Sequence, residues 1–143
     1  MKKVYYNVDK KITVGKVLDV LSKYPDRDIC MYNEDGVIIE YIDKDTISLE
    51  GMSYFYYIDE FETIERYKEA FDNSLIYSDI KAKHLVEVLS SNKDRYVSVI
   101  GSDSFTIYVD DENIIFDCIL CGKCFKDEVG ALKEAKEYEI YEI

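Results

Sequence analysis

Three cysteines close together are the residues of this sequence whose spacing most directly suggests metal chemistry. Cys118, Cys121 and Cys124 form the run CILCGKC, and C-x2-C followed by glycine is the shape of a zinc knuckle. A structural zinc site needs four ligands, and only Cys30 and His84 remain to complete one. We therefore expect reduced strand cysteines with no metal and no other cofactor. If a metal is bound, the three clustered cysteines are its expected ligands.

The sequence contains few of the residues and motifs on which enzyme catalysis usually depends. His84 is the only histidine, and no motif supplies it with a nucleophile or an orienting carboxylate. Phosphate loops, GxSxG elbows, HExxH helices and dinucleotide fingerprints are all absent from the sequence. The pair Asp26-Arg27 recurs as Asp94-Arg95, and we interpret both pairs as structural contacts at a helix–strand corner. We expect a protein that is not an enzyme.

The net charge of −12 restricts the partners. Nucleic-acid-binding proteins carry a basic face that neutralises phosphates, and anionic membranes attract basic segments, so neither is expected to bind directly. No apolar run reaches the roughly 18 residues of a membrane helix, and the N-terminus does not read as a secretory signal. An acidic surface suits fast, steered docking onto a basic protein. We expect a cytoplasmic protein with a basic protein partner, in an oligomeric state that the sequence leaves open.

Two surface features are candidates for the partner-binding site. One is acidic and consists of a stripe on a predicted helix together with a turn cluster. The other is a run of aromatic residues, which offers a large rigid surface with polar tips. Solvated acids and ordinary core packing are the alternative interpretations. The candidate residues are Glu62, Glu65, Glu69, Tyr54, Tyr56, Asp110, Asp111 and Glu112.

The elements that must position these residues occur twice along the chain. Aligning 12–75 with 80–143 without a gap makes 14 of 64 positions identical, at a fixed offset of 68 residues. Such self-similarity is the signature of one supersecondary unit used twice. We therefore divide the chain into a first repeat, 1–75, and a second repeat, 76–143, that form one compact domain with pseudo-two-fold symmetry.

Each repeat has the same predicted order of elements. In the first, a strand (3–8) precedes a helix (13–24) with Thr13 as its N-cap, and Pro25 ends that helix. Strands follow, with the turn Asn33-Glu34-Asp35-Gly36 predicting a hairpin, and a second helix begins near Asp59. The second repeat predicts a strand at 74–77, a helix at 81–91, four further strands and a helix at 127–137.

This pattern predicts an α+β fold: an internal tandem duplication of a β-α-β-β-β-β-α unit, with antiparallel sheets and helices packed on one face. The element order resembles the repeat of the TATA-binding-protein-like fold. That resemblance implies two halves joined into one curved sheet backed by helices. Because the charge does not fit that family's binding of DNA, the resemblance extends to architecture alone.

A shorter segment carries a second resemblance. Residues 13–31, TVGKVLDVLSKYPDRDICM, are similar to the helix–Pro–Asp–strand module of small accessory proteins of phages and mobile elements. The composition, rich in Ile, Lys, Tyr and Glu, fits a coding sequence from an AT-rich genome. The resemblance implies an anti-defence inhibitor.

Three functions remain open at this point. The first is a non-enzymatic inhibitor of a basic, nucleic-acid-binding or nuclease protein, such as an anti-CRISPR-type inhibitor or a toxin immunity protein. The second is a protein that binds or sequesters a small ligand or nucleotide in a pocket between the repeats. The third is a zinc-dependent structural module built on the cysteine cluster.

Overall fold

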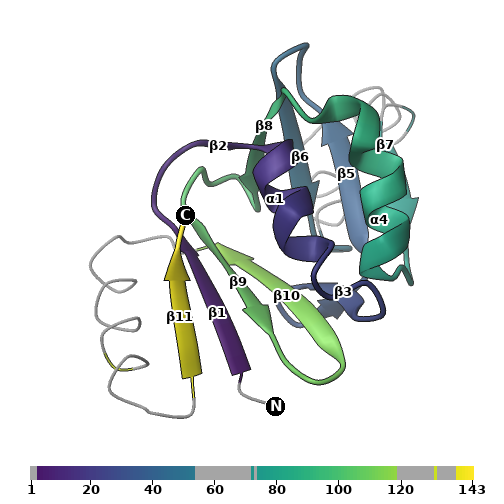
Figure 1. The fold of residues 1–143 in the computed structure, drawn as a ribbon. Coiled ribbons are helices and arrows are strands. Elements are labelled where there is room, and N and C mark those ends of the chain that lie inside the picture. The colour runs from purple at the N-terminus through teal and green to yellow at the C-terminus, as the bar shows by residue number, and fades with distance from the viewer. Residues whose placement is uncertain (1–2, 54–71, 73, 119–130, 132–137) are drawn as a thin grey trace.

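In its described residues the protein is an α+β molecule in which the helices α1 and α4 accompany two mixed β-sheets (Figure 1). The computed structural model describes residues 3–53, 72, 74–118, 131 and 138–143. Their elements are, in chain order, β1 (Lys3–Val8), β2 (Ile12–Thr13), α1 (Val14–Leu21), β3 (Asp28–Met31), β4 (Glu34–Asp35), β5 (Val37–Tyr41), β6 (Thr46–Glu50), β7 (Ser74–Tyr77), α4 (Ala82–Leu89), the 3-10 helix η1 (Ser90–Asn92), β8 (Tyr96–Val99), β9 (Phe105–Val109), β10 (Asn113–Cys118) and β11 (Tyr138–Glu142).

Neither sheet is purely antiparallel, which corrects the sequence prediction. Sheet A has the strand order β11-β1-β9-β10-β3-β4, and sheet B has the order β2-β8-β6-β5-β7. β1 is parallel to β11, β10 to β3, and β6 to β8. The reason is that two strands pair with a hairpin from the other half of the sequence. β3 lies beside the β9–β10 hairpin and is parallel to β10, and β8 lies beside the β5–β6 hairpin and is parallel to β6.

The hairpin predicted at Asn33-Glu34-Asp35-Gly36 does not join two long strands. β3 turns back only into the two-residue strand β4, with Cys30 opposite Asp35. At Gly36, whose φ is +89°, the chain then crosses into sheet B, where β5 pairs with β6 and β7. The prediction of a β3–β5 hairpin was therefore wrong, because this turn changes sheets. β5 and β6 form an antiparallel hairpin, and so do β9 and β10.

The two sheets share a four-strand core of the same order. In sheet B, β5 and β6 are flanked by β7 on one side and β8 on the other; in sheet A, β9 and β10 are flanked by β1 and β3. The directions match as well, since the first two pairings in each core are antiparallel and the third is parallel. Each sheet thus takes strands from both parts of the chain, and a boundary between 75 and 76 lies inside β7. The duplication itself stays a prediction.

The correspondence between the halves slips by one residue at a turn. Tyr41 pairs with Ile47 across the β5–β6 hairpin, whereas Val109, 68 residues after Tyr41, pairs with Ile114. Ile115, the residue that the gapless alignment equates with Ile47, is displaced by one position. The β9–β10 turn is thus one residue shorter, and the offset beyond it is 67.

Both helices begin with a backbone contact to the other half of the sequence. The Val14 amide donates to the Arg95 carbonyl at 2.8 Å, and the Ala82 amide donates to the Arg27 carbonyl at 2.9 Å. These bonds satisfy donors that a helix leaves open at its start. The side chain of Thr13 occupies the expected N-cap position but makes no capping hydrogen bond. The recurring Asp-Arg corners therefore connect the halves through their carbonyl groups.

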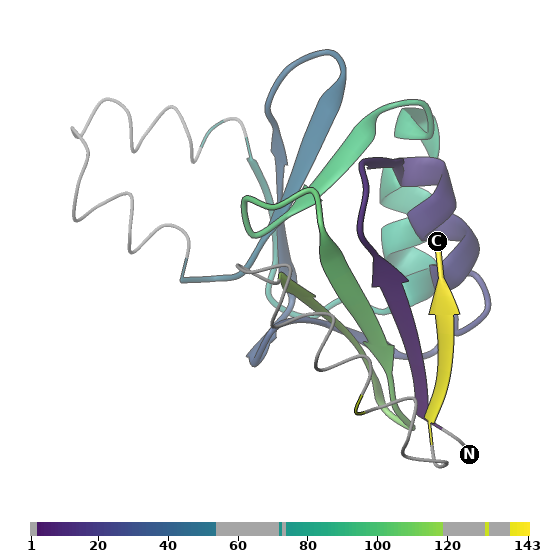
Figure 2. The ribbon, with the colours of Figure 1, turned by 90° about the vertical axis from the view of Figure 1, so that its left-hand side faces the viewer.

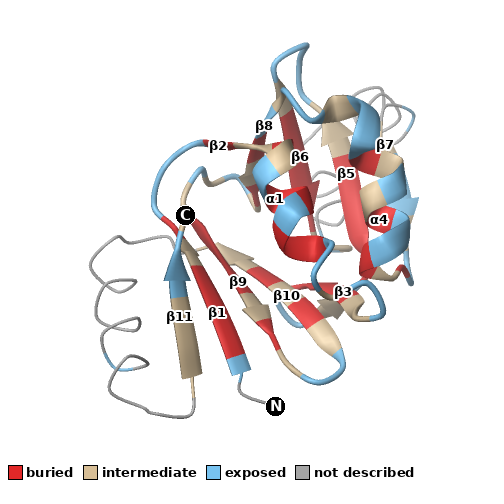
Figure 3. Cartoon of the chain, in the orientation of Figure 1, coloured by how far each residue is buried: buried red, intermediate tan, exposed pale blue. Residues whose placement is uncertain are grey.

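One core unites the helices and both sheets. Its buried residues come from α1, α4 and the strands, and Figure 3 colours the buried residues of these elements red. α1 and α4 lie on the same side of the strands (Figures 1 and 2). Both helices are shorter than the predicted spans 13–24 and 81–91.

Candidate functional site

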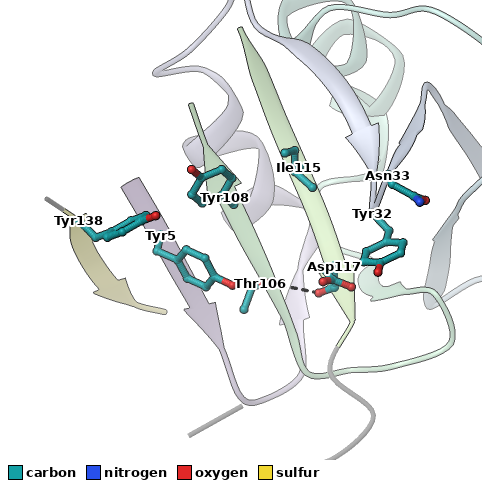
Figure 4. A pocket seen from close by; sticks show the side chains of 8 residues that line it. All are labelled: Tyr5, Tyr32, Asn33, Thr106, Tyr108, Ile115, Asp117 and Tyr138. Atoms are coloured by element: carbon teal, nitrogen blue, oxygen red, sulfur yellow. Dashed lines mark hydrogen bonds between the residues drawn. The ribbon is translucent and has the colours of Figure 1, made fainter. Parts of the chain in front are cut away.

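The described part of the chain contains an open pocket of about 410 Å³ on the outer face of sheet A, the face turned away from the core (Figure 4). We call it the tyrosine pocket. Four tyrosines account for half of its lining residues, which makes its walls largely aromatic. The lining residues are Tyr5, Tyr32, Asn33, Thr106, Tyr108, Ile115, Asp117 and Tyr138.

Strand alternation places these side chains outward. Along β1, Val4, Tyr6 and Val8 enter the core, so Tyr5 between them faces the other way. Along β9 the core residues are Phe105, Ile107 and Val109, which leaves Thr106 and Tyr108 on the outer face. The pairing register then aligns Tyr5, Tyr108 and Ile115 in one row across three strands.

The rings in the pocket contact one another. The Tyr5 and Tyr108 ring centroids are 5.6 Å apart, with the planes at 62°, an edge-to-face arrangement. The Tyr108 and Tyr138 centroids are 6.4 Å apart. Three strands therefore hold a connected aromatic floor whose rings can accept an apolar or cationic group on their faces.

A lysine occupies the β11 end of this floor. Lys3 Nζ lies 5.7 Å from the centroid of the Tyr138 ring, a cation–π distance. Burial raises the pKa of the Tyr108 hydroxyl, and a hydrogen bond with Lys3 partly opposes that effect. Tyr108 is therefore a neutral phenol at physiological pH.

The other end of the pocket contains polar acceptors. Asn7, Thr106 and Asp117 form a row across β1, β9 and β10, next to the tyrosine row. The Thr106 hydroxyl donates to the Asp117 carbonyl at 3.4 Å, the dashed line in Figure 4. The Asn7 Oδ1 atom is buried and has no hydrogen-bond partner. A buried acceptor without a donor costs free energy, but Asn7 lies in the sheet row beside the pocket and is not one of its lining residues.

Backbone strain positions Tyr32 and Asn33 at that same end. Tyr32 has a φ of 57°, in the left-handed region that residues other than glycine rarely adopt, and its amide donates to the Phe116 carbonyl at 2.6 Å. This bond holds the exposed Tyr32 ring beside the end of β10, where Asp117 lies. In sheet B, Ile100 is the corresponding residue, with a φ of 49° and an amide bonded to the Leu49 carbonyl.

Sheet B carries a buried acid where sheet A carries Asp117. Glu50 lies opposite Ile38 on β5, as Asp117 lies opposite Thr106 on β9. Glu50 is only 8% exposed, and its carboxylate accepts a hydrogen bond of 2.7 Å from the Ser48 hydroxyl. Burial raises the pKa of this carboxyl, while hydrogen bonds from Ser48 and the Gly101 backbone oppose the shift.

The partner-binding residues predicted at the β9–β10 turn divide into two roles. Asp110 stabilises the turn, because its carboxylate accepts the amides of Glu112 and Asn113 at 2.8 and 2.7 Å. Asp111 and Glu112 are exposed, three and four residues beyond Tyr108 on the same hairpin. The remaining predicted residues, Tyr54, Tyr56, Glu62, Glu65 and Glu69, lie outside the described residues.

The cysteines and the histidine form no metal cluster in the part of the chain that the structure describes. Cys30 is buried and donates to Asp35 Oδ1 at 3.4 Å, and burial first of all raises its pKa to about 12. Cys118 is half-buried with a raised pKa, caused first by burial and then by Asp117. His84 lies exposed on α4. Cys121 and Cys124 lie outside the described residues, so the zinc hypothesis stays a prediction.

Sequence reasoning missed the tyrosine pocket. Its residues come from four strands and the end of β3, and none of them was among the predicted partner-binding residues. The available signal was alternation: in KVYYNV and FTIYV, Tyr5 and Tyr108 fall on the phase opposite the aliphatic core residues. From the sequence alone, Tyr5 and Tyr108 could equally be aromatic residues of the core. Only the pairing register of the strands shows which residues lie beside them.

Comparisons with known proteins identify no relative of this chain. No protein-family model, no curated protein and no solved structure matches the chain. Among the described residues, the helices are too short to cross a membrane. Function must therefore be argued from the geometry of the tyrosine pocket and the charge of the chain.

Proposed function

We propose that this chain is a non-enzymatic binding protein that inhibits or neutralises a basic protein partner, of the nucleic-acid-binding or nuclease class. The observation that carries the proposal is the tyrosine pocket, an open aromatic hollow that is also lined by Thr106 and Asp117. Rings and acceptors together suit a cationic protein surface. The setting that fits best is a cytoplasmic anti-defence inhibitor or an immunity protein.

Charge supports the same partner class. The chain carries a net charge of −12, and the β9–β10 hairpin that floors the pocket ends in the exposed acids Asp111 and Glu112. Exposed acids at a rim speed the encounter with a basic partner, whereas aromatic anchors slow its release. Inhibition would follow from occlusion, because carboxylates would cover the Lys and Arg side chains with which the partner holds phosphates.

The test is capture of a partner from the native host, followed by binding measurements with matched variants. The captured protein should be basic, and its nucleic-acid binding or nuclease activity should fall when the chain is added. Tyr108→Ala should raise the dissociation constant about 10- to 100-fold, the range for loss of a buried aromatic anchor. The double variant Asp111→Asn, Glu112→Gln should lower the association rate, most clearly at low salt.

Tyr96→Ala is the matched control. Tyr96 is 41% exposed on sheet B, with Lys11 Nζ at 4.7 Å from its ring centroid, so this variant also removes an exposed tyrosine from a cation–π contact. It should leave binding unchanged. An acidic partner, or a basic one whose binding ignores salt and survives Tyr108→Ala, would contradict the proposal.

The size of the pocket favours a second candidate, binding of a small ligand. A volume of about 410 Å³ lies within the range of ligand pockets. The lining residues Tyr5, Tyr32 and Asn33 precede β7 and the other five follow it, so both halves contribute. A thermal-shift screen with nucleotides and aromatic amines separates the two functions: stabilisation by several degrees at millimolar ligand would favour the small-ligand function.

A further inference from the structure

We propose that strand β7 is a docking edge, at which an extended basic segment of the partner adds a further strand to sheet B. β7 is the last strand of that sheet, and among the described strands it pairs only with β5 (Figure 1). The inference rests on the proposed function for the class of partner. It adds a second surface, distinct from the tyrosine pocket, and a mode of binding.

The other three edges of the described sheets carry features that discourage the pairing of a foreign strand. β2 and β4 are only two residues long, and β11 contains Glu139 and Glu142. Short strands and charged side chains are the usual protection of a sheet edge. β7 is twice as long as β2 or β4, and its four residues, SLIY, are all uncharged. Of these edges, β7 is therefore the one best suited to accept another strand.

The outer side of β7 presents backbone groups that an added strand would satisfy. In an antiparallel pair, alternate residues direct their N–H and C=O groups toward the neighbouring strand, and the residues between them direct theirs away from it. Within the described part of the chain, no backbone hydrogen bond outside the β5 pairing involves Leu75, Ile76 or Tyr77. Strand addition gains its affinity from main-chain hydrogen bonds to groups of this kind.

Two exposed aliphatic side chains lie on this edge, one on each face of the sheet. Leu75 lies opposite Ile39, a residue of the core, and Ile76 lies opposite Ile38. Successive side chains of a strand point to opposite faces, so no single neighbour covers both. Leu75 and Ile76 are each 39% exposed. A partner strand with apolar residues on both of its faces would bury them.

Acidic residues at both ends of β7 favour a basic segment as its occupant. Asp72 and Asp79 are exposed, and they lie two residues before and two residues after the strand. Lys81, the next cation along the chain, forms an ion pair with Asp28 at 3.1 Å. A segment with apolar residues between flanking Lys or Arg residues therefore matches the edge in both hydropathy and charge.

The same acids disfavour a second copy of this chain. Two β7 strands related by a two-fold axis would pair antiparallel, with Leu75 of each copy opposite Ile76 of the other. That pairing would bring Asp72 of one copy toward Asp79 of the other, and like charges in such positions repel. Each copy also carries a net charge of −12. A basic partner avoids both costs.

Short synthetic peptides test the inference on the intact chain, without the captured partner. The probe is acetyl-KTVIVTK-amide. Acetyl-ETVIVTE-amide reverses its charge, and acetyl-KTPPVTK-amide keeps the charge but removes two adjacent backbone donors. Binding is followed by the amide chemical shifts and hydrogen exchange of 15N-labelled protein. We expect shifts at Leu75, Ile76 and Tyr77, slower exchange of an outward-directed amide among them, and at least about tenfold weaker binding of both control peptides.

Two variants and one control complete the experiment. Ile76→Lys places a charge of the probe's own sign on the edge and should weaken the basic peptide at least about tenfold. Leu75→Thr, a smaller and uncharged change, should weaken it severalfold and serves if the lysine variant does not fold. Tyr96→Lys adds the same charge at a residue 41% exposed on β8, three strands from β7, and should have no effect. Thermal unfolding verifies that each variant is folded.

The outcomes separate this inference from the proposed function. Undiminished binding of either control peptide, shifts located away from β7, or undiminished binding by both variants would overturn the docking edge. So would self-association in sedimentation equilibrium that Ile76→Lys abolishes, because the occupant would then be a second copy. In each of these cases, a captured basic partner that depends on salt and on Tyr108 would leave the proposed function in place. A captured partner insensitive to both would remove the proposed function, and the peptides would still decide whether β7 accepts a strand.

Discussion

Gly36 lies directly against the backbone of Tyr77, and this contact fixes the point at which the chain crosses from sheet A to sheet B. A Cβ atom at position 36 would overlap the Tyr77 carbonyl oxygen, and the φ of +89° is one that side chains with a Cβ rarely adopt. Gly36→Ala should therefore destabilise the fold by roughly 3 kcal/mol or more, combining strain with overpacking. Urea denaturation followed by circular dichroism measures the change.

Gly101→Ala is the control for backbone strain alone. Gly101 has a similar φ of +75°, but nothing lies within 4 Å of the added Cβ atom. It should cost only about 1–2 kcal/mol. Equal losses at the two positions would mean that the contact with Tyr77 contributes nothing.

Local signals predicted the elements well and the sheets poorly. The strands at 3–8 and 74–77 begin and end where the sequence placed them, and α1 and α4 lie 68 residues apart, as the repeat predicted. The sequence could not predict which strands pair with one another. The turn at Asn33–Gly36 has a hairpin-like sequence whether the chain folds back onto the same sheet or crosses to a second one. Alternation indicates which side chains of one strand share a face of the sheet. It does not indicate which strands pair with that strand.

The buried carboxyl of Glu50 should make stability fall as pH rises. Burial raises its pKa above the ordinary value of 4.5, so above that pH the native state retains a proton that the unfolded chain has released. Rising pH through this window therefore favours unfolding. Glu50→Gln keeps an acceptor for Ser48 but removes the ionisation. It should raise the free energy of unfolding at pH 7 and change it little below pH 4.

Glu87→Gln, an exposed change on α4, is the control for the loss of one charge. It should shift stability equally little at both pH values. If Glu50→Gln gives no greater gain at pH 7 than at pH 4, the carboxyl is ionised in the folded protein without penalty.

Cys30 should be an unreactive thiol in the folded protein. Burial and the hydrogen bond to Asp35 raise its pKa to about 12, so at pH 8 almost no thiolate is present. Alkylation by iodoacetamide should be at least about 100-fold slower than in urea. Peptide mass spectrometry separates Cys30 from the other three cysteines, and labelling at the rate seen in urea would refute the buried thiol.

The candidate site was less predictable than the fold because it depends on register. Tyr5, Tyr108 and Asp117 are more than a hundred residues apart at the extremes, and only the pairing of β1 with β9 and of β9 with β10 brings them together. Net charge and the abundance of tyrosine predict an acidic, tyrosine-bearing recognition surface, and this stays a prediction. They could not indicate which of the 14 tyrosines form it.

The exchange of strands between the halves predicts that neither half folds alone. β1 and β3 find their partners in β9 and β10, while β7 and β8 find theirs in β5 and β6. Fragments 1–73 and 74–143 should therefore each lack a cooperative unfolding transition, because six of the nine strand pairings in the described sheets join strands of different fragments. Mixed in equal amounts, they should regain the native circular dichroism spectrum and a single transition. A protease site between 73 and 74, cut after folding, supplies the control, since the two pieces should then remain together on size-exclusion chromatography. A fragment that unfolds cooperatively as a monomer would show that its half is an independent unit, and the contacts of Val14 with Arg95 and of Ala82 with Arg27 would then be dispensable for folding.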